Sequence, residues 1–285
     1  MKIGVSSYSF SKYLTAERCG YLKICDMAKE MGFGGIEFIG LQNSKWGEED
    51  DELITAERIR SHCADIGLEI IAYTVGANFL AADVGAEMQK LRHCVDVAAA
   101  LGVPIMRHDV VYKLREGRGE SYADVIPEIA PLINEISDYA SSKGIRTCTE
   151  NHGFIFQAPE CVVALIQAVN NPNYGWLCDM GNFLCVDAEP VRSVEIAAPY
   201  TVHAHAKDFL FKVGDGERPA GFGIATTGGN YLRGTVIGHG VVPVKECIDI
   251  LKKSGYDGWI SLEFEGAEDN IQALKDGLAN LKKWC

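Results

Sequence analysis

The sequence predicts an α/β protein that folds as a single (β/α)8 TIM barrel over residues 1–285. First, short β-rich runs alternate with helical stretches along the chain, the pattern of βαβ units around a parallel sheet. Second, eight such units fit into 285 residues, which favours a closed barrel. Third, no GxGxxG motif follows the first strand, so an open doubly wound sheet lacks its usual fingerprint.

The expected strands are short runs rich in apolar and β-branched residues. In chain order they cover 3–8, 35–39, 68–75, 103–108, 145–150, 175–179, 200–205 and 259–264. Helical patterns lie between them at about 16–31, 51–66, 84–101, 121–143, 159–169, 188–198, 243–254 and 269–283. Glycine stands where a left-handed helix cap would form, as in Lys143-Gly144 and Ser254-Gly255.

One segment interrupts this alternation. Residues 209–240 are rich in glycine and lack helical periodicity. A stretch this long without regular structure is unusual in a compact domain, where it commonly serves as a functional lid. Because the segment follows the seventh strand, we expect a lid or insert loop over the mouth of the barrel.

Composition excludes several classes of function. The formal net charge of −12 disfavours a nucleic-acid partner bound through its phosphates. No apolar run is long enough for a transmembrane helix, and the start MKIGVSSYSF leads directly into a strand pattern rather than a secretory signal. The ten cysteines form no CxxC pair, which is typical of reduced thiols. We therefore expect a cytoplasmic protein without a nucleic-acid or membrane partner.

Residues 201–209 read TVHAHAKDF. In a strand, His203, His205 and Lys207 share one face, since successive side chains alternate. Unpaired charge in a dry interior costs roughly several kcal/mol. These three side chains must therefore contact water, a ligand or a metal ion.

Ligand-type side chains end four consecutive expected strands, and these are Glu150, Asp179, His205 and Glu263. In a barrel the carboxyl ends of the strands meet at one mouth. Three carboxylates there would repel one another, and a divalent cation removes that repulsion. Three oxygen ligands and one imidazole suit Mn²⁺, Mg²⁺ or Co²⁺ better than structural Zn²⁺. The sequence thus predicts one divalent metal ion at these residues.

Four motifs resemble the sugar phosphate isomerase/epimerase family, the xylose-isomerase-like TIM barrels. They are CTENH (148–152), CDMGN (178–182), HAHAKD (203–208) and GYDGWISLEFEG (255–266). The resemblance extends along essentially the whole chain and implies one divalent metal, commonly Mn²⁺, with Mg²⁺, Co²⁺ and Zn²⁺ also compatible. It implies an isomerase or epimerase of a ketose or keto-sugar derivative. In the epimerases, the residues matching Glu150 and Glu263 exchange a proton beside a carbonyl, through a metal-stabilised enediolate.

Six residues are predicted to contact the substrate, and they are His152, Asn182, His108, Lys207, Tyr8 and Glu37. Arg107 and His108 end the same strand, so alternation turns one of them towards the helices. Lys207 is also expected to pair with Asp208. The ketohexose 3-epimerases have a histidine where this chain has Asn182, which weakens the transfer of their substrate and stereochemistry.

Other activities on this scaffold remain open. Inosose and dehydroshikimate dehydratases and some C-glycoside-cleaving enzymes share the metal site, so a lyase acting on a keto-polyol is the main alternative. An apurinic endonuclease would need more histidines at its strand ends, and the negative charge also disfavours DNA. A sugar-binding relative without activity is a fourth reading. The expected partner is a small sugar or polyol, and a homo-oligomer is compatible with the resemblance.

Overall fold

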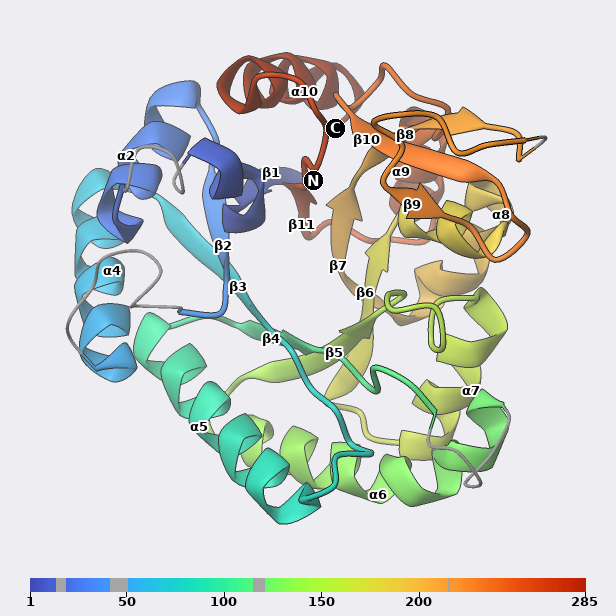
Figure 1. Ribbon diagram of the computed structural model, residues 1–285. Helices are drawn as coiled ribbons and strands as arrows, with labels where there is room; N and C mark the ends of the chain where they lie inside the picture. The colour runs from blue at the N-terminus through green and yellow to red at the C-terminus, as the bar shows by residue number, and fades with distance from the viewer. Residues whose placement is uncertain (14–18, 42–50, 115–120, 215) are drawn as a thin grey trace.

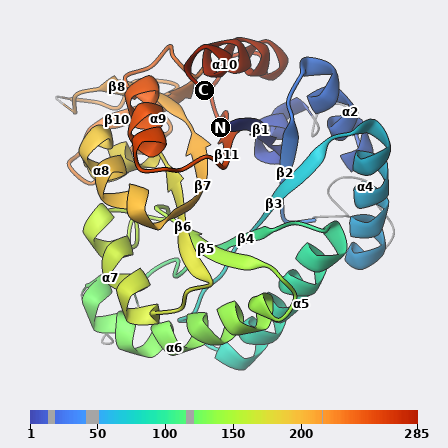
Figure 2. The same ribbon diagram turned by 180° about the vertical axis from the view of Figure 1, so that it is seen from behind.

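The computed structural model describes residues 1–13, 19–41, 51–114, 121–214 and 216–285. Eight parallel strands close into a barrel in the order β1-β11-β7-β6-β5-β4-β3-β2, and the helices form a ring around it (Figure 1, and from behind in Figure 2). The strands are β1 (Lys2–Ser6), β2 (Gly35–Ile39), β3 (Glu69–Val75), β4 (Ile105–His108), β5 (Arg146–Glu150), β6 (Tyr174–Asp179), β7 (Thr201–Ala206) and β11 (Trp259–Leu262). The predicted fold class is confirmed.

Eight α-helices of the described chain alternate with these strands. They are α2 (Tyr21–Met31), α4 (Glu52–Ile66), α5 (Val84–Leu101), α6 (Tyr122–Ser141), α7 (Pro159–Val169), α8 (Pro190–Ala197), α9 (Val244–Lys253) and α10 (Asn270–Trp284). The helix predicted at 16–31 begins only at Tyr21, and its first three residues lie outside the described ranges. The other seven agree with prediction to within two residues at each end.

Helix α6 shows why these segments become helices. Its start is fixed by a capping box, in which Ser121 and Asp124 each accept a hydrogen bond from the other's backbone. Apolar residues recur at helical spacing and are buried, including Ile129, Ile133 and Ile136. This stripe packs against α5, α7 and β5. The hydrophobic core therefore lies between the barrel and its ring of helices, which leaves the inside of the barrel for polar chemistry.

Two strands end earlier than predicted. Strand β1 stops at Ser6, and residues Ser7–Phe10 form a short 3-10 helix that carries Tyr8. Strand β11 stops at Leu262, although the backbone N–H of Glu263 still donates to the carbonyl of Ala206, 3.0 Å away. Both Tyr8 and Glu263 thus lie just beyond their strands, at the carboxyl end of the barrel.

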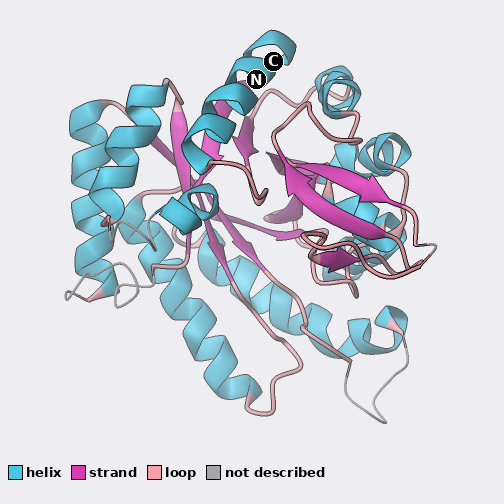
Figure 3. Cartoon of the chain, turned by 45° about the horizontal axis from the view of Figure 1, so that its top comes forward, coloured by secondary structure: helices cyan, strands magenta, loops and turns pink. Residues whose placement is uncertain are grey.

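The 209–240 segment is more ordered than predicted. It contains β8 (Asp208–Lys212), β9 (Ile224–Ala225) and β10 (Tyr231–Thr235), which form a small antiparallel sheet in the order β8-β10-β9. Figure 3 shows this sheet beside the barrel strands. The side chain of Asp208 holds the two ends of this segment together. It accepts hydrogen bonds from the backbone N–H groups of Phe209, Gly238, Gly240 and Val242. Its role as a lid, like the organisation of 1–285 as one domain, stays a prediction.

All ten cysteines are free thiols. Within the described ranges, none of the helices combines the length and apolar character that a membrane span needs.

Candidate metal centre at the mouth of the barrel

The four predicted ligand residues converge at the carboxyl ends of four adjacent strands. Asp179 and His205 are paired in register across β6 and β7, and β5 and β11 flank that pair. One donor atom from each of Glu150, Asp179, His205 and Glu263 lies within 4.8 Å of all the others. Nδ1 of His205 faces the three carboxylates at 3.6–3.8 Å. Parallel pairing thus brings together residues that are far apart in the chain.

Backbone contacts hold Asp179 in place. Its Oδ1 accepts hydrogen bonds from the N–H groups of Gly181 and Asn182, both at 2.8 Å. Asn151, which is fully buried, accepts from the backbone N–H of Asp179 and donates to its carbonyl. The side chain is therefore oriented with Oδ2 turned towards the cluster.

The residues at this point fit a divalent cation. Asp179 Oδ2 and His205 Nδ1 are both buried, and neither has a hydrogen-bond partner in the described chain. Burial and the neighbouring Glu150 and Glu263 carboxylates raise the pKa of Asp179 to about 6. A cation would bind Asp179 Oδ2 and His205 Nδ1, and its positive charge would offset the repulsion among the three carboxylates. Three oxygens with one nitrogen match the ligand preferences of Mn²⁺ and Mg²⁺.

Lys207 supplies a positive charge beside the cluster. Its Nζ lies 2.6 Å from Glu263 Oε2, 3.3 Å from Asp179 Oδ2 and 3.0 Å from the amide oxygen of Asn182. Burial opposes the charge, but Asp179 and Glu263 outweigh it and hold the pKa of Lys207 well above its ordinary value. The predicted pairing with Asp208 is wrong, because Lys207 pairs with Glu263 and Asp179, whereas the carboxylate of Asp208 accepts hydrogen bonds from backbone N–H groups.

A cavity of about 250 Å³ opens above these residues. Its lining includes Tyr8, His152 and Lys207, three of the predicted substrate contacts, together with Glu150 and Glu263. Tyr8 is 39% exposed, and the side chain of His152 is 51% exposed. The space suits a small polar molecule held against the carboxylates.

Of the two candidates at the end of β4, Arg107 is the one that reaches the mouth, where it meets Asp109, a residue that was not predicted. Arg107 Nη2 lies 2.8 Å from Glu150 Oε2 and 2.7 Å from Asp109 Oδ1, and Asp109 in turn lies 3.1 Å from Nδ1 of His152. The contact with Asp109 is the largest cause that raises the pKa of His152. Asp109 follows β4 directly, so its place after a strand end was the signal that could have identified it.

His108 does not reach the mouth, contrary to prediction. It is fully buried on the opposite face of β4 from Arg107, with its ring stacked on Tyr174 at 5.7 Å and edge-on to Phe79 at 5.4 Å. Its Nδ1 lies 2.8 Å from the carbonyl of Asp109. Strand alternation allowed either residue inside, and Arg107 takes that position because its charge can pair with Glu150.

Asn182 and Glu37 also differ from their predicted places, since neither lines the cavity. Asn182 is buried and its amide donates to Glu150 Oε1 at 2.8 Å, so it orients a carboxylate. Glu37 is fully buried beneath His205. Burial would raise the pKa of Glu37, but His205 and His203 outweigh it and hold that pKa well below its ordinary value.

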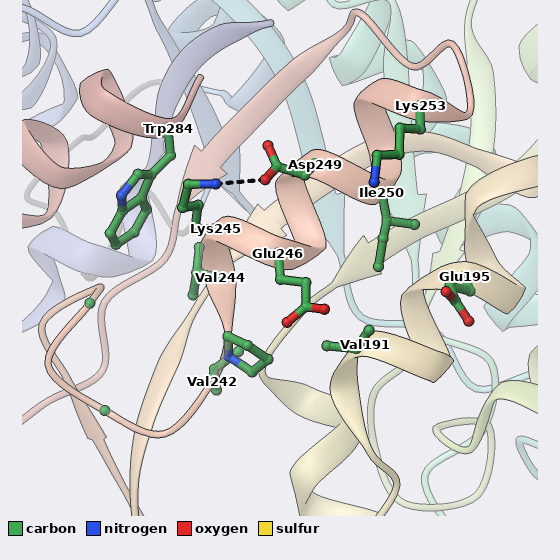
Figure 4. A pocket seen from close by; sticks show the side chains of 13 residues that line it. Val191, Glu195, Val242, Val244, Lys245, Glu246, Asp249, Ile250, Lys253 and Trp284 are labelled. Atoms are coloured by element: carbon green, nitrogen blue, oxygen red, sulfur yellow. Dashed lines mark hydrogen bonds and ion pairs between the residues drawn. The ribbon is translucent and has the colours of Figure 1, made fainter.

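A hollow larger than the cavity at the mouth lies elsewhere on the described surface. It measures about 710 Å³ and lies between α8 and α9, with Trp284 at one side (Figure 4). Its charged residues are of both signs, and Lys245 pairs with Asp249 at 2.7 Å. It shares no lining residue with the mouth, and the described residues gather no ligand-type cluster there.

Curated proteins similar to this chain include two inosose dehydratases. The one from Histophilus somni (strain 129Pt) is 29% identical over 150 residues, which is 48% of this chain and 47% of the relative. The one from Glaesserella parasuis serovar 5 (strain SH0165) is 30% identical over 147 residues with the same coverage. The matches thus span about half the length of these relatives.

Solved structures share the fold over the whole chain. A probable 3-DHS dehydratase from Bacillus anthracis is 21% identical, covers 99% of both chains and has a TM-score of 0.76. A D-psicose 3-epimerase, solved with D-fructose present, is 18% identical, with a TM-score of 0.72 and coverage of 100% and 99%. Related structures are described with zinc, in the IOLI protein, or with magnesium, in a Mycobacterium smegmatis protein.

The barrel, the strand-end motifs and these similarities agree with the resemblance found in the sequence. Residues 25–284 match the model of the xylose isomerase-like TIM barrel family, and the chain belongs to that family.

Proposed function

We propose that the protein is a divalent-metal-dependent isomerase or epimerase of a small ketose or keto-sugar derivative. The observation that carries the proposal is the convergence of Glu150, Asp179, His205 and Glu263 at the mouth, with donor atoms within 4.8 Å. Similarity to an epimerase of the same fold supports the substrate class. The reaction begins when a proton leaves the carbon next to the carbonyl.

Glu150 and Glu263 form the proposed acid/base pair. Both line the cavity, so their carboxylates can reach a bound molecule. Arg107 contacts Glu150 and Lys207 contacts Glu263, which gives the two groups different surroundings. One carboxylate accepts the substrate proton and the other delivers a proton to the opposite face. Lys207 and His152 are positioned to donate hydrogen bonds to substrate hydroxyls.

Glu150, Asp179, His205 and Glu263 would hold the metal. A bound divalent cation would polarise the substrate carbonyl and stabilise negative charge on its oxygen. We propose Mn²⁺ as the native ion, since three of the four donors are oxygens. Zinc or magnesium in structures of the same fold supports a divalent ion in general.

Dehydration of a keto-polyol is the second candidate, and a specific observation favours it. The curated relatives are inosose dehydratases, and a probable 3-DHS dehydratase shares the fold. Such a reaction begins with the same proton abstraction, but the C–O bond beside it then breaks. The hydroxyl leaves as water after accepting a proton, and His152 beside Asp109 is placed in the mouth to donate it.

A substrate screen followed by NMR in deuterated water tests both candidates. The protein is loaded with Mn²⁺ and offered ketoses, keto-inositols and 3-dehydroshikimate, and each reaction is repeated with a chelator. An epimerase or isomerase incorporates deuterium without loss of water, whereas a dehydratase forms an alkene or arene product. Absence of turnover on every substrate, or turnover that survives complete metal removal, would overturn the proposal.

A further inference from the structure

Glu37 occupies an unusual position beneath the metal centre. It lies in the middle of β2 and is fully buried, and it does not line the cavity. Its Oε2 accepts a hydrogen bond from Ser261 Oγ at 2.8 Å and another from His203 Nε2, also at 2.8 Å. Its Oε1 lies 2.8 Å from His205 Nε2, although the ring N–H is not well aligned with it. A buried carboxylate is thus surrounded by donors.

His205 presents its two ring nitrogens to different partners. Nε2 is beside Glu37, and Nδ1 faces the carboxylates of Glu150, Asp179 and Glu263. A neutral imidazole has one N–H and one lone pair, and only the lone pair can bind a metal. An ionised carboxylate accepts but cannot donate, so it favours the proton on the nitrogen next to it.

We propose that Glu37 is a positioning residue, which acts by keeping the proton of His205 on Nε2 so that the Nδ1 lone pair is directed at the metal. The inference rests on the proposed metal centre and adds a residue to it. His203 and Ser261 act on Glu37 in turn, because their hydrogen bonds fix the plane of its carboxylate. The two imidazole rings lie 5.6 Å apart at 80°, and one carboxylate serves both.

The variant Glu37→Gln tests this role. A glutamine side chain has one oxygen and one NH₂ group, so it cannot accept from both histidines, and its NH₂ group favours a lone pair on the nitrogen it faces. We expect Mn²⁺ affinity to fall about 10–100-fold, measured by EPR of free Mn²⁺ in equilibrium titrations. Glu69→Gln is the matched control. It makes the same substitution in an exposed pair with Lys2, away from the mouth, and its Mn²⁺ affinity should not change.

Nitrogen NMR on ¹⁵N-histidine-labelled protein gives a readout that does not depend on a variant folding. With diamagnetic Zn²⁺ bound, His205 in the wild type should show a metal-bound Nδ1 and a protonated Nε2. A metal-bound Nε2, or unchanged Mn²⁺ affinity in folded Glu37→Gln, would overturn the role of Glu37. Two Mn²⁺ ions in the wild type and one in the variant would also overturn it, because Glu37 would then be a ligand.

Failure of the proposed function has a different signature. If the wild type binds no Mn²⁺, or if Asp179→Asn and His205→Ala bind it as well as the wild type, the metal centre itself is wrong. If these two variants lose Mn²⁺ binding and Glu37→Gln does not, only the positioning role is lost.

Discussion

At the scale of single residues, the mouth depends on carboxylates whose surroundings differ. Glu150 contacts Arg107 and Asn182, whereas Glu263 contacts Lys207. Burial would raise the pKa of Glu263, but Lys207 and His205 outweigh it and hold that pKa well below its ordinary value. Glu263 is therefore ionised without a substrate, which is the protonation state that a general base requires.

Glutamine at either position keeps the size of the side chain and removes its ability to exchange a proton. We expect Glu150→Gln and Glu263→Gln each to lower kcat by roughly 10²–10⁴-fold, with an unchanged circular dichroism spectrum. Steady-state kinetics on the substrate found by the screen gives the measurement. Glu69→Gln, which breaks an exposed pair with Lys2, is the control and should keep full activity. Normal turnover in a mouth variant would contradict the acid/base assignment.

His108 predicts a specific dependence of stability on pH. Burial lowers its pKa from 6.5 to about 4, so the folded state disfavours the charged ring. Between pH 6.5 and 4 the unfolded chain takes up a proton at this site that the folded chain does not. Stability is therefore lost as pH falls through this window, by at most about 1.4 kcal/mol per pH unit. Above pH 6.5 this residue makes no such contribution.

Urea unfolding from pH 7.5 to 4.5 tests this dependence by comparing the wild type with His108→Phe. The variant should lose stability less steeply below pH 6.5, whatever its stability at neutral pH. Equal slopes for the two proteins would show that another group accounts for the acid sensitivity.

At the scale of elements, periodicity predicted the regular parts of the fold. Helices α5 and α7 begin and end at the predicted residues, because each has a continuous apolar stripe and clear ends. The sheet β8-β10-β9 was not predicted. Its strands are short and pair antiparallel across a glycine-rich loop, so local sequence carries little of the information that joins them.

The candidate site shows the same limit. Glu150 and Asp179 were predicted because each ends its strand, and the end of a strand is visible in the sequence. Glu37 lies two residues before the end of β2, so it is deeper in the barrel than Glu150 and Asp179. The depth of a side chain inside a barrel depends on strand tilt and register. The face on which His108 lies depends on which of two adjacent polar residues finds a partner, and only the tertiary structure decides that.

Asp187 anchors the small sheet to the segment after β6. It accepts hydrogen bonds from Thr226, Thr227, the backbone N–H of Gly228 and Asn230. We expect Asp187→Ala to speed amide hydrogen exchange in 226–235 by at least several-fold, with a small effect on global stability, because the site is close to the surface. Hydrogen exchange read by mass spectrometry gives the result. Glu217→Ala, at an exposed position of the same segment, serves as control, and equal exchange in the two variants would exclude Asp187 as the anchor.

At the scale of the whole molecule, the polar interior joins strands that are distant in the chain. The four candidate ligands come from β5, β6, β7 and the end of β11, which are adjacent in the barrel. Beneath them, Glu37 connects β2 to β7 and β11 through His203 and Ser261. A cation bound at the mouth would therefore cross-link half of the closed barrel, and the unfolded chain offers no comparable arrangement.

This arrangement predicts that Mn²⁺ stabilises the folded protein. A ligand that binds only the folded state adds RT ln(1 + [L]/Kd), about 2.7 kcal/mol at a hundredfold excess over Kd. For a protein of this size that raises Tm by roughly 4–5 °C, and a chelator should reverse the rise. Differential scanning fluorimetry over a Mn²⁺ series measures it. Asp179→Asn should lose the metal-dependent rise, whereas Asp187→Ala should keep it, since Asp187 lies outside the cluster. A rise that persists in Asp179→Asn would locate the ion elsewhere, because Asp179 is the central carboxylate of the four strands and has a buried oxygen without a hydrogen-bond partner in the described chain.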